Sequence, residues 1–137
     1  MIGLVLVCHG KMADGLMDAM QMITGEQAGV RGIGLMETES VEDLTAKIRS
    51  AVEEVDSGEG VLILVDLFGA SPFNASAGLI LASPKRTWEL VTGLNLPMLV
   101  ELVVQRQGLS LPQAVDLVLK AGPEGIRRLS DVKGLEH

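Results

Sequence analysis

The sequence contains few of the residues that support cross-linking, base stacking or metal binding. One cysteine in 137 residues excludes an internal disulfide and fits a reducing cytosol. Tyrosine is absent, the aromatic residues are two Phe and one Trp, and the formal net charge is −7, which argues against nucleic-acid binding. With His137 set aside as part of a tag-like ending, one cysteine and one histidine cannot build an ordinary zinc site, although carboxylates could hold magnesium. We therefore expect no nucleic-acid partner and no metal.

Targeting and nucleotide-binding segments are also missing. No apolar run reaches the ~18 residues of a membrane helix. The N-terminus enters a strand-like run directly, without a charged region or a cleavage site, so we expect no signal peptide and a cytoplasmic location. Neither the phosphate-binding pattern Gly-x-x-x-x-Gly-Lys-Ser/Thr nor a Gly-x-Gly-x-x-Gly after a strand occurs, and no organic cofactor is predicted.

What the chain does have is a regular alternation of apolar runs and helical patterns, typical of a three-layer α/β domain with a parallel sheet between helices. The length fits a single domain, which we assign to residues 1–133. The ending Gly134–His137 reads like the remnant of an expression tag, so it is excluded from the argument. The predicted strands are Ile2–Val7, Val30–Leu35, Gly60–Leu67 and Thr87–Thr92, in the order 2-1-3-4.

Five helices are expected between and after these strands. They cover about 12–24, 41–55, 71–82, 95–107 and 111–122. Ser40 is the expected N-cap of the second helix and Ser71 that of the third. The segment Ile126–Leu129 is predicted as an antiparallel strand at one sheet edge.

A candidate site lies where the first and third strands end. Open α/β sheets bind ligands beyond the carboxyl ends of their strands, where the strand order reverses. His9 follows the first strand and Asp66 follows the third, so the two side chains should face each other. A carboxylate that accepts a hydrogen bond from Nδ1–H leaves Nε2 as a free nucleophile. This pair predicts phosphoryl chemistry on His9.

The residues beside the pair favour an anion. Gly69, Ala70 and Ser71 lead into a predicted helix, whose first N–H groups and dipole attract negative charge. Gly10 follows His9 directly. These four residues are the predicted phosphate-binding residues, and Cys8 is read as a packed strand residue.

Three motifs carry a resemblance to a known family. Val7–Gly10, Leu64–Asn74 and Gly93–Glu101 closely resemble the mannose-family enzyme IIA domain of the bacterial sugar phosphotransferase system. The resemblance implies that His9 accepts a phosphoryl group from the histidine-containing phosphocarrier protein and passes it to enzyme IIB. It also implies that Asp66 hydrogen-bonds the histidine, and that the membrane components IIC and IID are only indirect partners.

The resemblance further implies a homodimer in which the antiparallel fifth strand is exchanged. From the residues alone, the segment 126–129 could cover the sheet edge of its own chain or of a partner, and Gly122-Pro123 reads as a stiff hinge that favours exchange.

Two other functions stay open: a phosphoryl-donor subunit for dihydroxyacetone kinase, and a regulatory module that senses phosphorylation without passing the group on. The transported sugar cannot be read from this chain.

Overall fold

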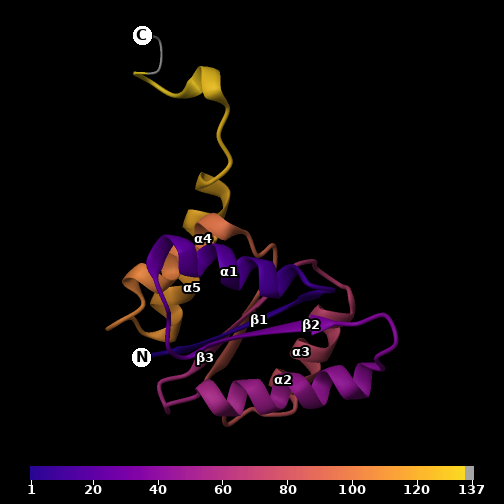
Figure 1. Cartoon of the computed structure of the whole chain (residues 1–137). Coiled ribbons are helices and arrows are strands. Elements are labelled where there is room, and N and C mark those ends of the chain that lie inside the picture. The colour runs from indigo at the N-terminus through magenta and orange to yellow at the C-terminus, as the bar shows by residue number, and fades with distance from the viewer. Residues whose placement is uncertain (135–137) are drawn as a thin grey trace.

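The computed structural model describes residues 1–134, so the predicted tag remnant lies almost wholly outside the described residues. Figure 1 shows a sheet between two layers of helices, with the C-terminal segment leaving the body. The strands are β1 (Gly3–His9), β2 (Val30–Leu35), β3 (Val61–Val65) and β4 (Trp88–Val91). The helices are α1 (Met12–Thr24), α2 (Val41–Val55), α3 (Ser71–Leu81), α4 (Leu96–Gln105), α5 (Leu111–Glu124) and the short 3-10 turn η1 (Leu129–Asp131).

The four strands form one parallel sheet in the order β2-β1-β3-β4, as predicted. Strand β1 therefore lies in the centre, with Leu4 opposite Val30 of β2 and opposite Leu62 of β3. Within residues 1–134, no helix is both long and apolar enough to cross a bilayer.

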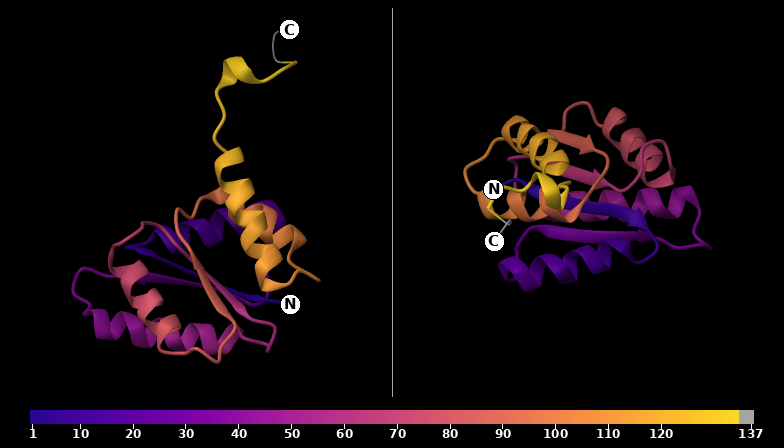
Figure 2. Two further views of the ribbon diagram at one scale, coloured as in Figure 1. Left: turned by 180° about the vertical axis from the view of Figure 1, so that it is seen from behind. Right: turned by 90° about the horizontal axis from the view of Figure 1, so that it is seen from above.

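Alternating side chains of the central strands divide the core in two. Leu4, Leu6 and Cys8 face α1, α4 and α5, whereas Val5 and Val7 face α2 and α3. Figure 2 shows the two helical layers from behind and from above. Because both faces are covered, the strands read as continuous apolar runs rather than as alternating ones.

Side-chain hydrogen bonds lie at the starts of helices α2 and α3. The Ser40 side chain accepts a hydrogen bond from the amide of Asp43 (3.0 Å), which confirms the predicted N-cap of α2. The third helix corrects the prediction: its N-cap is Ala70, and Ser71 is the first helical residue. The Asn74 side chain donates to the carbonyl of Gly69 (3.2 Å), bracing the turn one residue earlier than expected.

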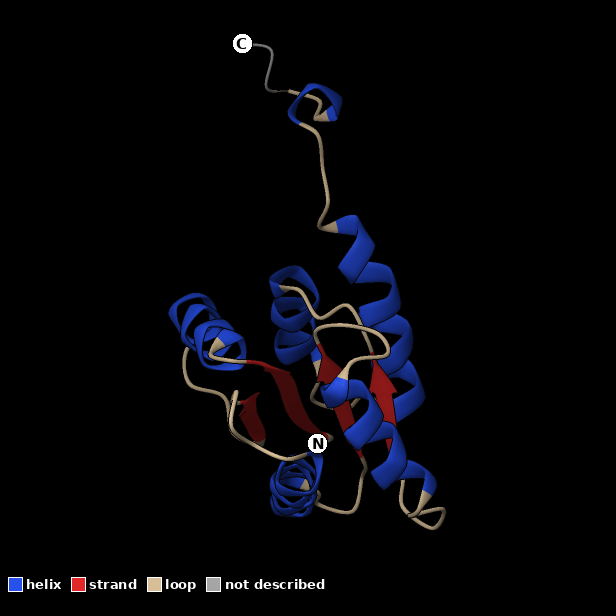
Figure 3. Ribbon diagram, turned by 90° about the vertical axis from the view of Figure 1, so that its right-hand side faces the viewer, coloured by secondary structure: helices blue, strands red, loops and turns tan. Residues whose placement is uncertain are grey.

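The C-terminal segment departs from the sequence-based expectation. Helix α5 continues through Gly122-Pro123 to Glu124, so these residues are the last turn of a helix and not a hinge. In the segment 126–129, predicted as a strand, residues 126–128 are irregular and Leu129 begins η1. Figure 3 shows this segment extending away from the sheet. Ile126 and Leu129 are 81% and 73% exposed.

Candidate functional site

His9 and Asp66 meet at the carboxyl ends of neighbouring strands. His9 is the last residue of β1, and Asp66 follows Val65, the last residue of β3. The register places Val7 opposite Val65, so the chain positions that follow lie side by side. The strand predicted to continue to Leu67 ends at Val65. From Asp66 onward the chain turns toward α3.

One carboxylate oxygen binds His9 twice. Oδ2 of Asp66 accepts a hydrogen bond from the backbone amide of His9 (2.8 Å) and lies 2.8 Å from its Nδ1. The Asp66 side chain is 10% exposed and the His9 side chain 49%. Asp66 is thus a buried support, while the imidazole edge that carries Nε2 is open to an incoming group.

Hydrogen bonds from His9 favour the ionised form of Asp66. Burial opposes ionisation, but the hydrogen bonds from the backbone and ring of His9 outweigh it and hold the pKa of Asp66 below its usual value. An ionised Asp66 accepts a hydrogen bond from Nδ1–H of His9, which selects the tautomer with a free lone pair on Nε2. Burial, with a contribution from Asp66, raises the pKa of Cys8 to about 12, so this thiol is unreactive at neutral pH.

The start of α3 supplies the anion-binding groups beside the pair. Gly69 has a φ of +81°, a conformation that favours glycine, and it turns the chain into the helix. The N-cap Ala70 provides no side-chain cap, so the first N–H groups of α3 keep free hydrogen-bonding capacity. A helix N-terminus of this kind suits a phosphate.

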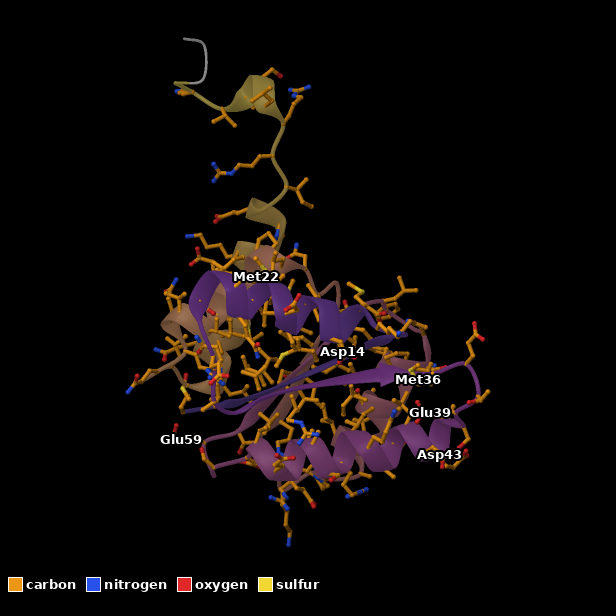
Figure 4. The ribbon with its side chains drawn as sticks, in the orientation of Figure 1. Asp14, Met22, Met36, Glu39, Asp43 and Glu59 are labelled. Carbon is orange, nitrogen blue, oxygen red and sulfur yellow. The ribbon has the colours of Figure 1, made fainter. Side chains whose placement is uncertain are left out.

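A cleft of about 720 Å³ opens next to His9. His9, Gly10 and Ser71 line it, whereas Gly69 and Ala70 do not. Most of its remaining wall comes from the segment Leu35–Val41, which the sequence reading did not assign to the site. The predicted strand order could have indicated that this segment belongs to the site, because β2 ends at the same sheet edge as β1. Figure 4 places Met36, Glu39 and Asp43 together at this end of the molecule, and Glu59 at the other.

Across the part of the chain that the structure describes, no group of three or more His, Cys, Asp or Glu side chains is arranged to hold a metal ion. The groups present at this edge of the sheet include an imidazole, a carboxylate and the N–H groups at the start of α3.

Comparisons with known proteins point to one family. The family model described as "PTS system fructose IIA component" matches residues 3–119. The chain is 36% identical over 129 residues to the mannose-specific EIIAB component of Escherichia coli (strain K12), which covers 93% of this chain and 39% of that protein. It is also 36% identical over 128 residues to the sorbose-specific EIIA component of Lacticaseibacillus casei, covering 93% and 91%.

The fold agrees with these sequence matches. The crystal structure of phosphotransferase system component EIIA from Streptococcus agalactiae superposes with a TM-score of 0.89 at 32% identity, covering 96% of this chain and 100% of that one. The chain spans 39% of the length of the mannose-specific EIIAB relatives, and nearly all of the sorbose-specific one. Since the family match includes most of the chain and both strand ends that carry the site, the chain belongs to the mannose-type enzyme IIA family of the bacterial sugar phosphotransferase system.

Proposed function

We propose that this chain is a phosphoryl carrier that uses His9 as its acceptor. The observation that carries the proposal is the 2.8 Å contact between Nδ1 of His9 and Oδ2 of Asp66, which leaves Nε2 free at the mouth of the cleft. The donor is a histidine-containing phosphocarrier protein, and the recipient is enzyme IIB. Membrane components IIC and IID take part only through IIB, and the transfer takes place in the cytoplasm.

The transfer step follows from the geometry. The lone pair on Nε2 of His9 attacks the phosphorus of the donor phosphohistidine, and the donor's N–P bond breaks with its electron pair returning to the donor ring. The His9 ring gains positive character, which the Asp66 carboxylate stabilises. The reverse sequence discharges the group onto IIB. Protein side chains supply every group in this step, so no metal or organic cofactor is required.

The phosphoryl oxygens need donors of their own. We assign that role to the backbone around Gly10 and to the start of α3, where Gly69 and Ala70 shape the turn and Ser71 offers an amide and a hydroxyl. Gly69 and Ala70 act through the shape of the turn, since they do not line the cleft.

The relatives favour transfer over the other functions left open by the sequence. Those with more than 30% identity are named as mannose-, sorbose- and fructose-specific components of the sugar system. A kinase-donor subunit and a sensing module have no such support. The particular sugar belongs to the partner components, because the carrier holds only the phosphoryl group.

A C2 homodimer with an exchanged strand accounts for the C-terminal segment. Strand β4 lies at one edge of the sheet, and the exposed segment 126–129 extends away from its own body. Pairing this segment antiparallel to β4 of a second chain would protect the edge and bury Ile126 and Leu129. Truncation after Gly125, read by light scattering, should convert a dimer into a monomer; a truncated chain that stays dimeric would refute the exchange.

The carrier function is tested by phosphoryl labelling. Incubation with labelled phosphoenolpyruvate, enzyme I and the phosphocarrier protein should label the chain, and adding IIB should remove the label. His9→Ala should take up none. Label on His9→Ala would refute the acceptor assignment, whereas label that stays on the wild type after IIB is added would favour the sensing module.

A further inference from the structure

The loop between β2 and α2, residues 36–40, forms one wall of the His9 cleft. At its two ends, the apolar side chains of Met36 and Val41 are 44% and 48% exposed. An exposed apolar rim around a nucleophile is suited to contact with a protein surface. The loop must therefore keep one shape if a partner is to dock on it repeatedly.

The pair formed by Glu39 and Lys47 fixes that shape. Oε1 of Glu39 accepts hydrogen bonds from the backbone amide of Met36 (2.9 Å) and from Nζ of Lys47 (2.8 Å). The backbone amide of Glu39 donates back to the carbonyl of Met36 (3.0 Å), which closes a tight turn. The hydrogen bond from Lys47, with that from Met36, lowers the pKa of Glu39, so the carboxylate stays charged at neutral pH.

Lys47 connects the same loop, through the end of β2, to the turn that follows His9. Its Nζ also donates to the carbonyl of Gly34 (3.0 Å), the residue before the last of β2. Gly34 packs directly on Gly10, because a Cβ at this position would overlap the carbonyl oxygen of Gly10. The amide of Gly10 in turn donates to the carbonyl of Leu35 (2.9 Å). One ammonium group thus joins the loop to the end of β2, and the end of β2 in turn contacts the turn that follows His9.

We propose that Lys47 and Glu39 are positioning residues, which hold the β2–α2 loop as the docking wall for the protein that delivers the phosphohistidine. The inference rests on the proposed function of His9 and adds a partner-recognition role to it. The ring of His9 takes its orientation from Asp66, which comes from β3 on the other side of β1. Lys47 and Glu39 therefore act on recognition of the donor protein and not on the nucleophile.

Steady-state transfer from the phosphocarrier protein separates these two roles. Lys47→Met and Glu39→Gln should each raise the KM for the donor protein about threefold to fivefold, the range for one partly exposed ion pair, with kcat changed less than twofold. Lys47→Arg keeps the charge and should recover most of the affinity. The double variant should raise the KM by less than the product of the two single effects, because both changes weaken the shared Glu39–Lys47 contact.

A matched control is available on β2 and α2, the two elements that flank the loop. Arg31 of β2 and Glu54 of α2 form an exposed ion pair toward the opposite end of β2, so Glu54→Gln should leave both constants unchanged. The positioning role would be overturned if Lys47→Met and Glu39→Gln kept the wild-type KM, or if they lowered kcat at constant KM. Either result would leave the proposed function of His9 intact. A wild-type chain that takes no label would instead refute the proposed function, and with it this inference.

Discussion

Replacing Asp66 by Asn perturbs the proposed mechanism with almost no change in shape. The amide oxygen can keep the contacts now made by Oδ2 to the backbone amide and Nδ1 of His9, both 2.8 Å. The other carboxylate oxygen, Oδ1, is buried without a hydrogen-bond partner, so placing the amide nitrogen there breaks no existing hydrogen bond. The substitution removes the negative charge that faces the ring.

The size of the effect follows from the charge removed. Two unit charges about 4 Å apart interact by about 4 kcal/mol at an effective dielectric constant of 20. The ring carries only part of a positive charge during transfer, and the half-exposed His9 side chain is screened by water. Half of that energy, about 2 kcal/mol, corresponds to a loss of about 30-fold in rate.

Rapid-quench measurement of single-turnover transfer from the labelled phosphocarrier protein gives this rate directly. Asp18→Asn on the exposed surface of α1 is the matched control and should transfer at the wild-type rate. Thermal unfolding of Asp66→Asn shows whether the fold is retained. A folded Asp66→Asn that transfers within twofold of wild type would refute the orienting role of the carboxylate.

Three further changes test the fold around the site. Asp56 and Asp66 both have pKa values held below their usual range, so the stability they contribute is complete above about pH 4 and is lost as the pH falls further; urea midpoints should be flat from pH 7 to 5 and drop below 4. Gly34→Ala forces a methyl group onto the carbonyl of Gly10 and should cost about 1–3 kcal/mol in urea unfolding, with equal stability contradicting the close approach. Arg106, 1% exposed, donates to three backbone carbonyls, and Arg106→Met should destabilise by about 3 kcal/mol in the same assay, whereas a change under 0.5 kcal/mol would contradict that role.

Much of the fold could be predicted because its signals are local or periodic. The spacing of Leu44, Ile48 and Val52 identifies one buried face, and Ser40 marks where its helix begins. Buried apolar runs separated by helices indicate a parallel sheet. Strand order then brings the predicted pair His9 and Asp66 together, as the structure shows.

The remaining features depend on contacts that no short segment encodes. Gly34 in β2 is required by the close approach of Gly10. The β2–α2 loop joins the cleft only through the sheet edge that it shares with β1, and its pair Glu39–Lys47 spans two elements. Helix α3 has Ala70 rather than Ser71 as its N-cap, and the Asn74 side chain bonds the carbonyl of Gly69, a contact that the motif Ser71-Pro72 does not reveal.

The nitrogen that bears the phosphoryl group is the most direct test of the proposed mechanism. Phosphorylated protein with ¹⁵N-labelled histidine can be examined by ¹H–¹⁵N and ³¹P NMR, and the label should survive base and be lost in mild acid. Because Asp66 engages Nδ1 of His9, phosphorus should be bonded to Nε2. Phosphorus on Nδ1 of His9, or on any other residue, would contradict the mechanism.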